Sequence, residues 1–404
     1  MYSPATDTLS SLDKATACAA GEPPFAIARL RFDIIREPET IEDEWHDLSA
    51  LPHNSLHQGF DWCHAWWSGH GHTPLAVRGR LDGRTVMILP LDVTSTGGFR
   101  IAFLAGSRFN NLNTGLFSAD FPTPTAAELP ILGNALRCCL APHADLLMMR
   151  ALPLAWNGIA NPLAGLATAE NPNPSFQLPL LGDMEKTIAQ LNAKSRRKKY
   201  NVQRRRIEAV GGFEHICPQT VAEQHALLDL FFAQKAERFA TSGLPDVFQP
   251  PEIRRFLHGL LDSPRTDTDT PLTLHALRLC GEHAGRVVAI SGLSRKGDHV
   301  LCQFGSIDDR LCPEASPGEL LFWLIIEESA RQGASVFDFG MGDQPYKRSW
   351  CTQTTRMYDI LLPLTWKGRV GRRAIAGLNA ARAAIKRRPR LYSLLQRLRA
   401  LRTR

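Results

Sequence analysis

Hydrophobic and polar positions recur along the chain in two similar blocks, and this recurrence predicts two successive α/β units. In the first block, short alternating apolar segments predict strands, and longer segments with helical spacing predict helices. The Asp82-Gly83 pair, which lies between two of these strands, is typical of a tight hairpin turn. The predicted strands are residues 32–35, 75–80, 85–93, 101–105 and 144–149, and the predicted helices are residues 39–50, 58–68 and 126–140.

A stretch rich in proline and asparagine, residues 161–174, follows the first block and predicts a loop or a connection between domains. After it, a long and very basic segment, residues 184–210, predicts one helix that ends at Gly211-Gly212. The other helices predicted in the second block are residues 221–242, 250–261 and 317–332, and the predicted strands are residues 272–280, 286–295, 299–307, 335–339 and 357–362.

The two blocks also repeat a detail. The segments 75–91 and 274–293 both read as hairpins with a glycine in the middle, which indicates an internal structural duplication. We therefore divide the chain along these blocks. Residues 1–28 are expected to be a disordered lead, residues 29–181 an N-terminal half, residues 182–363 a C-terminal half, and residues 364–404 a basic amphipathic tail.

The composition agrees with two globular halves in a cytoplasmic protein. A chain of 404 residues with 44% hydrophobic content can bury two cores of ordinary size. No apolar run reaches the length of about 18 residues that a transmembrane helix needs, and the chain does not open with a signal-peptide pattern. The 9 cysteines include no C-x-x-C pair, which favours reduced thiols in the cytoplasm.

The net charge of +7 is concentrated in two segments. Residues 194–206 carry 8 lysines or arginines and residues 360–404 carry 13, with no acidic residue in either segment, so the rest of the chain is acidic. The amphipathic end of the tail, residues 386–404, is a candidate for peripheral contact with an anionic membrane. Nucleic acid is an unlikely partner, because the segments lack interleaved aromatic residues and any nucleic-acid motif.

A proline and a glycine precede the most apolar helical segment, and this helix start is a candidate anion site. Ser316 is a candidate N-cap, Pro317 suits the first helical turn, and Glu319 favours the positive end of the helix. Such a start offers free backbone N–H groups from Ser316 to Leu320, and Gly318 allows an anion to approach them closely. The alternative is an ordinary capped core helix.

A strand that ends in a polar, glycine-rich loop follows this helix, over residues 336–350. Asp338 lies at the predicted end of the strand, and Asp343 lies in the loop. A partly buried carboxylate at such a place has a raised pKa and can act as a general base. Asp343 is the stronger candidate, because Asp338 has the alternative role of bracing the turn at Gly340.

These segments, in this order, resemble the GNAT-fold acyltransferases of the FemAB-like superfamily. The resemblance covers residues 182–360 and rests on the basic segment, the hairpin at residues 283–308, the Ser-Pro-Gly helix start, and the FDFG and YK-x-x-W motifs at residues 337–350. It is closest to the CelD-like branch, which is associated with cellulose or exopolysaccharide and carries a BioF-like acetyltransferase domain. In place of the R/Q-x-x-G-x-G/A loop of GNAT proteins, this chain has Pro-Glu-Ala-Ser-Pro-Gly.

The resemblance implies a fold of two tandem GNAT-like halves, each a mixed, mostly antiparallel sheet flanked by helices, with a degenerate first half. It also implies an N-acyltransferase that uses acetyl-CoA or another acyl-CoA and acylates an amine of a sugar or amino-acid-like acceptor. That activity would serve exopolysaccharide, cellulose or cell-envelope biosynthesis. The alternative is a non-catalytic accessory protein of a polysaccharide assembly, with a decayed GNAT scaffold and a membrane-surface tail.

Residue roles follow from the same resemblance. The helix start would hold the pyrophosphate of CoA, Tyr346 would protonate the leaving thiolate, and Lys347 would bind phosphate or stabilise the oxyanion. The alternatives for the last two are an ordinary loop tyrosine and a salt-bridged lysine. Arg197, Asn201 and Arg204 recur at helical spacing and are candidates to bind an anionic acceptor or the 3′-phosphate of CoA, the alternative being a solvated face.

Metal binding is not expected from the sequence. Histidines gather in the N-terminal half, but no cysteine or carboxylate completes a known metal signature with them. These histidines are therefore expected to be ordinary surface or core residues. They are His53, His57, His64, His70 and His72.

Overall fold

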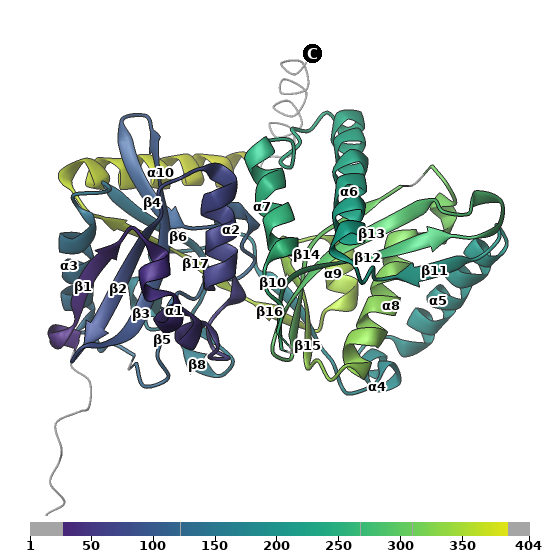
Figure 1. Ribbon diagram of the computed structural model, residues 1–404, viewed down its shortest axis with the longest axis horizontal. Coiled ribbons are helices and arrows are strands. Elements are labelled where there is room, and N and C mark those ends of the chain that lie inside the picture. Colours follow the sequence, from purple (N-terminus) through teal and green to yellow (C-terminus); the bar gives the residue numbers. More distant parts are fainter. Residues whose placement is uncertain (1–26, 122, 267, 309, 387–404) are drawn as a thin grey trace, which may run out of the picture.

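The computed structural model describes residues 27–386, except residues 122, 267 and 309, as two halves that lie side by side (Figure 1). Most of the expected lead and the part of the tail after residue 386 lie outside these described residues. Each half contains one mixed sheet flanked by helices, which confirms the predicted fold class. None of the helices described is long and apolar enough to cross a membrane.

The first sheet has the strand order β1-β2-β3-β4-β6-β17-β9. Strands β1 to β4 form an antiparallel meander, β6 is parallel to β4, and β17 is antiparallel to β6. Helices α1 and α2 lie between β1 and β2 in the chain, and α3 lies between β4 and β6. The strands are β1 (Arg31–Ile35), β2 (Leu75–Leu81), β3 (Arg84–Thr96), β4 (Phe99–Leu104), β6 (Leu146–Pro153), β9 (Ala169–Glu170) and β17 (Met357–Pro363), and the helices are α1 (Glu42–Ser49), α2 (Phe60–His70) and α3 (Leu129–Leu140).

The second sheet has the order β11-β12-β13-β14-β15-β10-β16 and repeats this pattern. Strands β11 to β14 form the meander, β15 is parallel to β14, and β10 is antiparallel to β15. Helices α6 and α7 follow β11, and α8 connects β14 to β15. The strands are β10 (Ser175–Pro179), β11 (Phe213–Ile216), β12 (Asp269–Leu279), β13 (Val287–Lys296), β14 (His299–Ile307), β15 (Val336–Met341) and β16 (Gln353–Thr355), and the helices are α6 (Val221–Ser242), α7 (Pro251–Asp262) and α8 (Pro317–Arg331).

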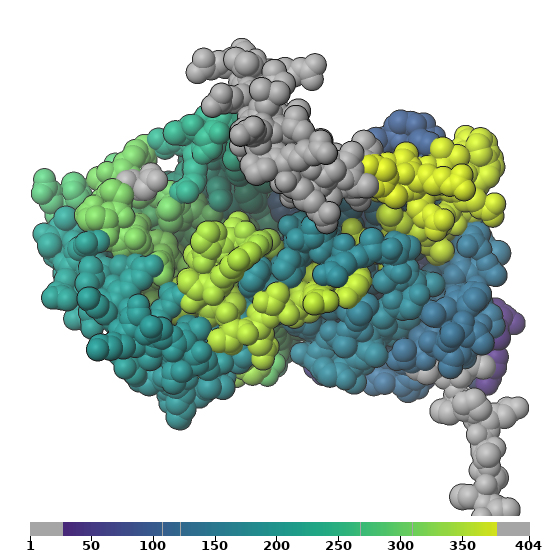
Figure 2. Space-filling view, turned by 180° about the vertical axis from the view of Figure 1, so that it is seen from behind, coloured from purple at the N-terminus to yellow at the C-terminus, as the bar shows by residue number. Residues whose placement is uncertain are grey.

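The two halves exchange one strand each. Strand β10 precedes the C-terminal half in the chain but lies in the second sheet, whereas β17 follows that half and lies in the first sheet. Figure 2 shows the yellow-green segment that leads to β17 crossing from one half to the other. This corrects the assignment of the predicted strand 357–362 to the C-terminal half. Hydrophobic alternation identifies a strand, but it does not show which sheet edge will accept it.

Two predicted elements differ in their local structure. The basic helix expected over residues 184–210 is two helices, α4 (Met184–Ala189) and α5 (Ala193–Glu208). The break occurs because the Asn192 side chain accepts a hydrogen bond from Ser195 N at 3.1 Å and so caps α5. The loop expected to carry Tyr346 and Lys347 contains a short helix, α9 (Pro345–Trp350), which begins with a proline.

A hydrophobic cluster between α2, α6 and α7 joins the two halves. Trp62 of α2 packs edge-to-face on Phe256 of α7, with ring centroids 5.4 Å apart. Gly69 permits this approach, because a Cβ there would lie 2.8 Å from Phe256 N. Figure 1 shows α7 lying between the two sheets, beside α2. The halves therefore share a core, which fixes how residues of the first half meet the second sheet.

Candidate functional site

Strands β14 and β15 separate towards their carboxyl ends. They pair in parallel register from His299↔Val336 to Leu301↔Asp338. Beyond that point β14 continues to Ile307, and among the described strands its remaining residues pair with β13 alone. We term the opening between residues 302–307 and 339–341 the strand gap. On the β14 side, the backbone groups of residues 303–307 that face the opening have no ladder partner among the described strands, and such an edge retains its bonding capacity for a ligand.

A residue from the first half closes the inner end of the strand gap. Asn111 Nδ2 donates to Gln303 Oε1 at 2.8 Å and lies 3.4 Å from Cys302 O. On the other side of the gap, a Cβ on Gly340 would lie 2.6 Å from Asn111 Oδ1, so a glycine is needed there. Gln303 Nε2 also lies 3.0 Å from His57 Nε2, and burial lowers the pKa of His57 to about 4. His57 is therefore a neutral, buried part of the contact between the halves.

The equivalent opening in the first half is filled by its own chain. Strands β4 and β6 pair at Ile101↔Leu146 and Ala102↔Leu147. Beyond this, Asn113 bonds to the backbone of β6, with its N donating to Ala151 O at 3.3 Å and its Nδ2 donating to Arg150 O at 2.7 Å. These bonds occupy the edge that a ligand would need, so the strand gap of the second half is the better candidate site.

Asp338 lies at the point where the strands separate, and it is held as a buried carboxylate. Its oxygens accept hydrogen bonds from Ser175 Oγ at 2.9 Å, Gln177 Nε2 at 3.0 Å and Gly340 N at 2.7 Å. His299 Nε2 lies 3.4 Å away. Burial alone would raise the pKa of Asp338, but His299, Gln177 and the Gly340 N–H together lower it. The raised pKa expected from the sequence is wrong, and the hydrogen bond from Gly340 N supports the alternative role of bracing that turn.

Asp343 and Lys347 are both engaged by neighbouring groups. Asp343 is exposed and forms an ion pair with Arg348, whose hydrogen bond lowers the pKa of Asp343. The raised pKa expected for this carboxylate is therefore also wrong. Lys347 is buried, and its Nζ donates to Gly340 O at 3.1 Å and to Met341 O at 2.6 Å. Its ammonium thus satisfies carbonyl groups at the end of β15, where the sequence predicted contact with phosphate or an oxyanion.

The start of α8 presents one free backbone donor. Ser316 lies at the N-cap with φ of +48°, but its side chain makes no capping bond. Such a left-handed conformation is rare for serine and is characteristic of functional turns. The N–H groups of Glu319 and Leu320 bond to Ser316 O, and Pro317 has no N–H. Gly318 N therefore remains as the donor without an acceptor among the described residues, where the sequence predicted several.

Helix α5 faces this start with a different set of cations from the one predicted. Arg196 Nη1 lies 2.9 Å from Glu319 Oε1, and its guanidinium lies over Trp350 at 4.0 Å from the ring centroid. Lys199 also pairs with Glu319, which neutralises the acidic side chain at the helix start. Sequence reasoning missed these two residues, although the cap at Asn192 sets the phase of α5 and so could have revealed them.

The predicted anion-binding face of α5 is exposed and partly paired. Arg197 pairs with Glu185, and Arg204 Nε lies 2.9 Å from Glu208 Oε1. Asn201 lies between them on the exposed surface. This face differs from the one that contacts α8, so the structure does not bring the three residues to the start of that helix. Their role as an anion site stays a prediction.

Tyr346 lies on the β15 side of the strand gap, where its ring contacts one residue of α8 and one of β15. Its ring stacks on Phe322, with centroids 5.6 Å apart and planes 12° apart, and it lies 6.0 Å from the ring of Phe339. The residue is 38% exposed. Burial of the remainder, with a smaller effect of Cys302, raises the pKa of Tyr346 well above its ordinary value. The hydroxyl is therefore protonated at neutral pH and can donate a proton.

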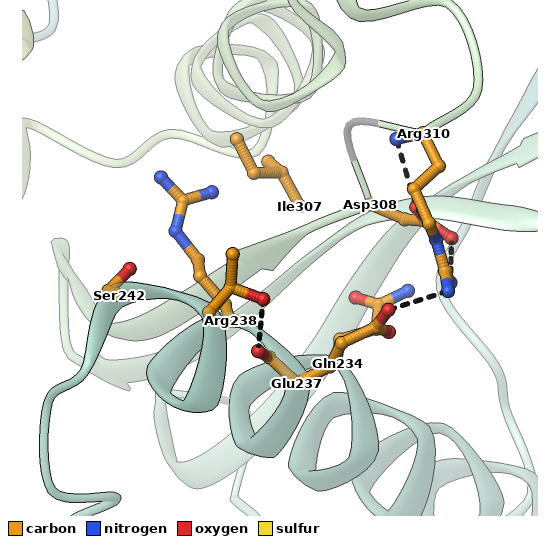
Figure 3. Close-up of a pocket in the computed structure, with 8 residues that line it drawn as sticks. Gln234, Glu237, Arg238, Ser242, Ile307, Asp308 and Arg310 are labelled. Carbon is orange, nitrogen blue, oxygen red and sulfur yellow. Dashed lines mark hydrogen bonds and ion pairs between the residues drawn. The ribbon is translucent and has the colours of Figure 1, made fainter. Parts of the chain in front are cut away.

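A cleft of about 370 Å³ lies between the C-terminal turns of α6 and the end of β14 (Figure 3). Ile307 lines it, and a Cβ on Gly318 would lie 2.7 Å from Ile307 Cγ2, so the cleft adjoins the start of α8. Arg238 extends from α6 towards Ile307, and its guanidinium has no acceptor among the described residues. Arg310 by contrast pairs with Glu237 and Asp308. Strand gap, helix start and cleft are thus contiguous around Ile307.

Part of the second half is similar to a known protein family. Residues 194–348 match the family described as the acetyltransferase (GNAT) domain. The matched segment spans less than half of the chain, but it contains all of α5 except its first residue, the strand gap and α8. No curated protein matches the chain.

Two solved structures share the overall arrangement at low sequence identity. The crystal structure of FemX is 10% identical with a TM-score of 0.57, over 82% of this chain and 97% of that chain. The C-terminal domain of a putative lysylphosphatidylglycerol synthetase from Agrobacterium fabrum is 12% identical with a TM-score of 0.52, over 85% of this chain and 96% of that chain. Such low identities establish the fold alone. The chain therefore has the fold of two tandem GNAT-like halves, and residues 194–348 of its second half match the acetyltransferase (GNAT) domain family.

Proposed function

We propose that the protein is an acyl-CoA-dependent N-acyltransferase with its donor site in the second half. The observation that carries this proposal is the strand gap that opens beside the start of α8, with Gly318 N free at the junction. The acetyltransferase match over residues 194–348 supports the same proposal. Both observations favour an enzyme over the accessory-protein alternative.

The features around Ile307 correspond to the chemical parts of acyl-CoA. The pyrophosphate would lie at the start of α8, where the Gly318 N–H and the positive end of the helix favour an anion. Arg238 in the adjoining cleft would add a cation. The pantetheine arm carries two amides, so it would extend along the free backbone edge of residues 302–307 and bring the thioester into the strand gap.

Acyl transfer then needs a proton donor for the leaving thiolate. The acceptor amine attacks the thioester carbonyl, a C–N bond forms, and the C–S bond breaks. Tyr346 donates its hydroxyl proton to the thiolate, and the proton released by the amine restores Tyr346 directly or through water. The hydroxyl holds this proton at neutral pH, because even the ordinary tyrosine pKa of 10.0 lies well above 7 and burial raises it further. Asp338 and Asp343 stay predicted bases, although hydrogen bonds or an ion pair already engage each of them.

The acceptor is proposed to be an amine of a sugar or an amino-acid-like molecule. Asn111 and His57 of the first half border the inner end of the strand gap, so residues of both halves would lie beside the acceptor. The CelD-like branch, the polysaccharide context, the cytoplasmic location and the membrane contact of the tail stay predictions from the sequence. The last of these concerns residues 386–404, which lie almost wholly outside the described part of the chain.

Calorimetric titration with acetyl-CoA and longer acyl-CoAs tests the proposal. We expect one site per chain, because only the second half retains an open strand gap among the described residues. Dephospho-CoA, which lacks the 3′-phosphate, is compared with CoA. Weaker binding of dephospho-CoA would indicate that a cationic surface, such as that of Arg197 and Arg204, contacts this phosphate. Failure of every acyl-CoA to bind the folded protein would contradict the proposed function.

Replacing Tyr346 by phenylalanine is expected to lower kcat by about 100-fold, because the proton donor for the thiolate is lost. The Kd for acetyl-CoA should stay the same, since the phenyl ring still stacks on Phe322. Tyr358→Phe is the matched control, because Tyr358 lies on β17 in the other sheet. Steady-state kinetics measure kcat with the acceptor identified by screening, and equal rates for Tyr346→Phe and wild type would rule out this role.

A further inference from the structure

Two histidines and a glutamate converge at the edge of the second sheet. His215 lies on β11, His275 on the neighbouring β12, and Glu328 near the C-terminal end of α8. His215 is the cross-strand partner of Leu277, so His275 lies diagonally across from it, two residues away along β12. Glu328 lies 10 residues after Gly318 on α8, which places it about 15 Å along the helix axis from the proposed pyrophosphate site. The group is therefore separate from the donor site and from the histidines considered in the sequence.

The ligand-forming atoms of the three side chains lie within 4.8 Å of one another, one from each residue. His215 Nε2 is 3.1 Å from His275 Nδ1. Glu328 Oε2 is 3.7 Å from His215 Nδ1 and 4.0 Å from His275 Nδ1. Ligands at about 2.1 Å from a tetrahedral zinc ion are about 3.4 Å apart. The group therefore needs small side-chain adjustments to coordinate a metal ion.

The surroundings prepare these side chains for coordination. The other oxygen of Glu328, Oε1, accepts a hydrogen bond from Gln332 Nε2 at 3.0 Å, which leaves Oε2 directed at the imidazoles. Such orienting bonds are typical of metal ligands.

We propose that His215, His275 and Glu328 bind a divalent transition-metal ion, with zinc the best match to two nitrogen ligands and one carboxylate oxygen. Water would complete the coordination, because His215 and Glu328 are partly exposed. The ion would tie the edge strand β11 and its neighbour β12 to α8. That link would stabilise α8, whose other end forms the proposed anion site. The metal proposal does not depend on whether acyl-CoA binds there.

A second histidine pair provides an internal control. His225 Nδ1 and His258 Nδ1 lie 2.6 Å apart, and the rings stack with centroids 4.9 Å apart. Their outer nitrogens, however, point in opposite directions, with His225 Nε2 2.8 Å from Asp262 and His258 Nε2 3.1 Å from Asp229. Asp262 and Asp229 therefore do not lie beside the two Nδ1 atoms, so no carboxylate joins these nitrogens around one point. This pair resembles the proposed site in ring stacking but lacks its third ligand.

The test uses untagged full-length protein, dialysed against chelator and then against buffered zinc. We expect about one equivalent of bound zinc by elemental analysis and a rise in the thermal midpoint of about 2 °C or more. Glu328→Gln and His275→Gln should each weaken zinc binding by at least about 10-fold. His225→Gln should bind zinc as the wild type does. Cobalt substitution gives a second readout, since a tetrahedral site with nitrogen and oxygen ligands produces intense visible absorption.

Several outcomes would overturn the proposal. Wild-type protein without bound zinc or cobalt would show that the group is a metal-free contact between two imidazoles. Equal zinc content in wild type and Glu328→Gln would place the ion elsewhere, and so would its loss in His225→Gln. Glu328→Gln preserves the shape of the side chain, and circular dichroism establishes that the variant is folded. Because metal content is measured without acyl-CoA, failure of this proposal is distinguishable from failure of the proposed function.

Discussion

Replacing Gly318 by tryptophan is expected to abolish detectable binding of acyl-CoA, with Kd raised by at least about 100-fold. A Cβ at this position would already lie 2.7 Å from Ile307 Cγ2, and an indole would extend into the cleft that adjoins it. The substitution also blocks access to Gly318 N, the free donor at the start of α8. The loss of the contact with the pyrophosphate and the loss of the space for acyl-CoA together lower the binding free energy by about 3 kcal/mol or more. Calorimetry with acetyl-CoA measures the change.

The control for this experiment is Gly377→Trp. Gly377 lies on α10 (Trp366–Lys386), and a Cβ there would meet no atom within 4 Å. The same side chain is thus added to a helix without a steric conflict. Thermal unfolding of both variants separates loss of the site from loss of the fold. If Gly318→Trp is folded and binds acetyl-CoA with the wild-type Kd, the donor does not lie at the start of α8.

Replacing Asp338 by asparagine is expected to lower the free energy of unfolding by about 3 kcal/mol. The carboxylate accepts bonds from Ser175, Gln177 and Gly340, which lie on β10 and β15. An asparagine offers one acceptor oxygen, so one of these buried donors would face an NH2 group. Strand β10 precedes the C-terminal half in the chain, and these bonds help to hold it beside β15. The substitution therefore weakens the attachment of β10 to the second sheet. Urea unfolding measures the loss.

Asp338 also predicts how stability depends on pH. The folded state lowers its pKa, so the unfolded chain binds the proton more readily. Its contribution is therefore present above the ordinary value of 3.8 and is lost as the pH falls below that value towards the folded pKa. The Asp338→Asn variant should lose less stability than the wild type over this acid range. Parallel acid-unfolding curves of the two proteins would contradict an ionised, hydrogen-bonded Asp338.

Asp343→Asn is the matched control for both measurements. Asp343 is a nearby carboxylate that also has a lowered pKa, but its partner Arg348 lies at the surface. Water replaces such a contact readily, so stability should stay close to that of the wild type. A large loss in Asp343→Asn would show that the exposed ion pair orders the loop before α9. The comparison thus separates the buried carboxylate from a general effect of charge.

The local elements of the fold could be predicted because they depend on neighbouring residues. Alternating and helical apolar periods located most strands and helices, including α6 at Val221–Ser242 and β14 at His299–Ile307. The Asp82-Gly83 turn was identified by residues that tolerate positive φ, and both have it. The break at Asn192 was missed, because a side-chain cap interrupts a helix without changing the basic character of the segment.

The candidate site could be predicted in part. The sequence located the start of α8 and singled out Tyr346, because the Ser-Pro-Gly turn and the YK-x-x-W segment are local signals. It could not show that Glu319 N and Leu320 N bond back to Ser316 O, which leaves one free donor. It also gave no sign that Asn111 of the other half closes the strand gap, since no periodicity links segments so far apart.

By itself, the sequence determined most of the secondary structure, the duplication, and the acidic and basic segments of this protein. Each of these follows from residues within a few turns of one another, whose propensities and spacing act locally. The tertiary structure alone decided that β10 and β17 exchange sheets, that Asp338 is an ionised brace, and that His215, His275 and Glu328 converge. These features depend on which distant surfaces pack together, because burial and hydrogen-bond partners set strand pairing and pKa values only in the folded chain.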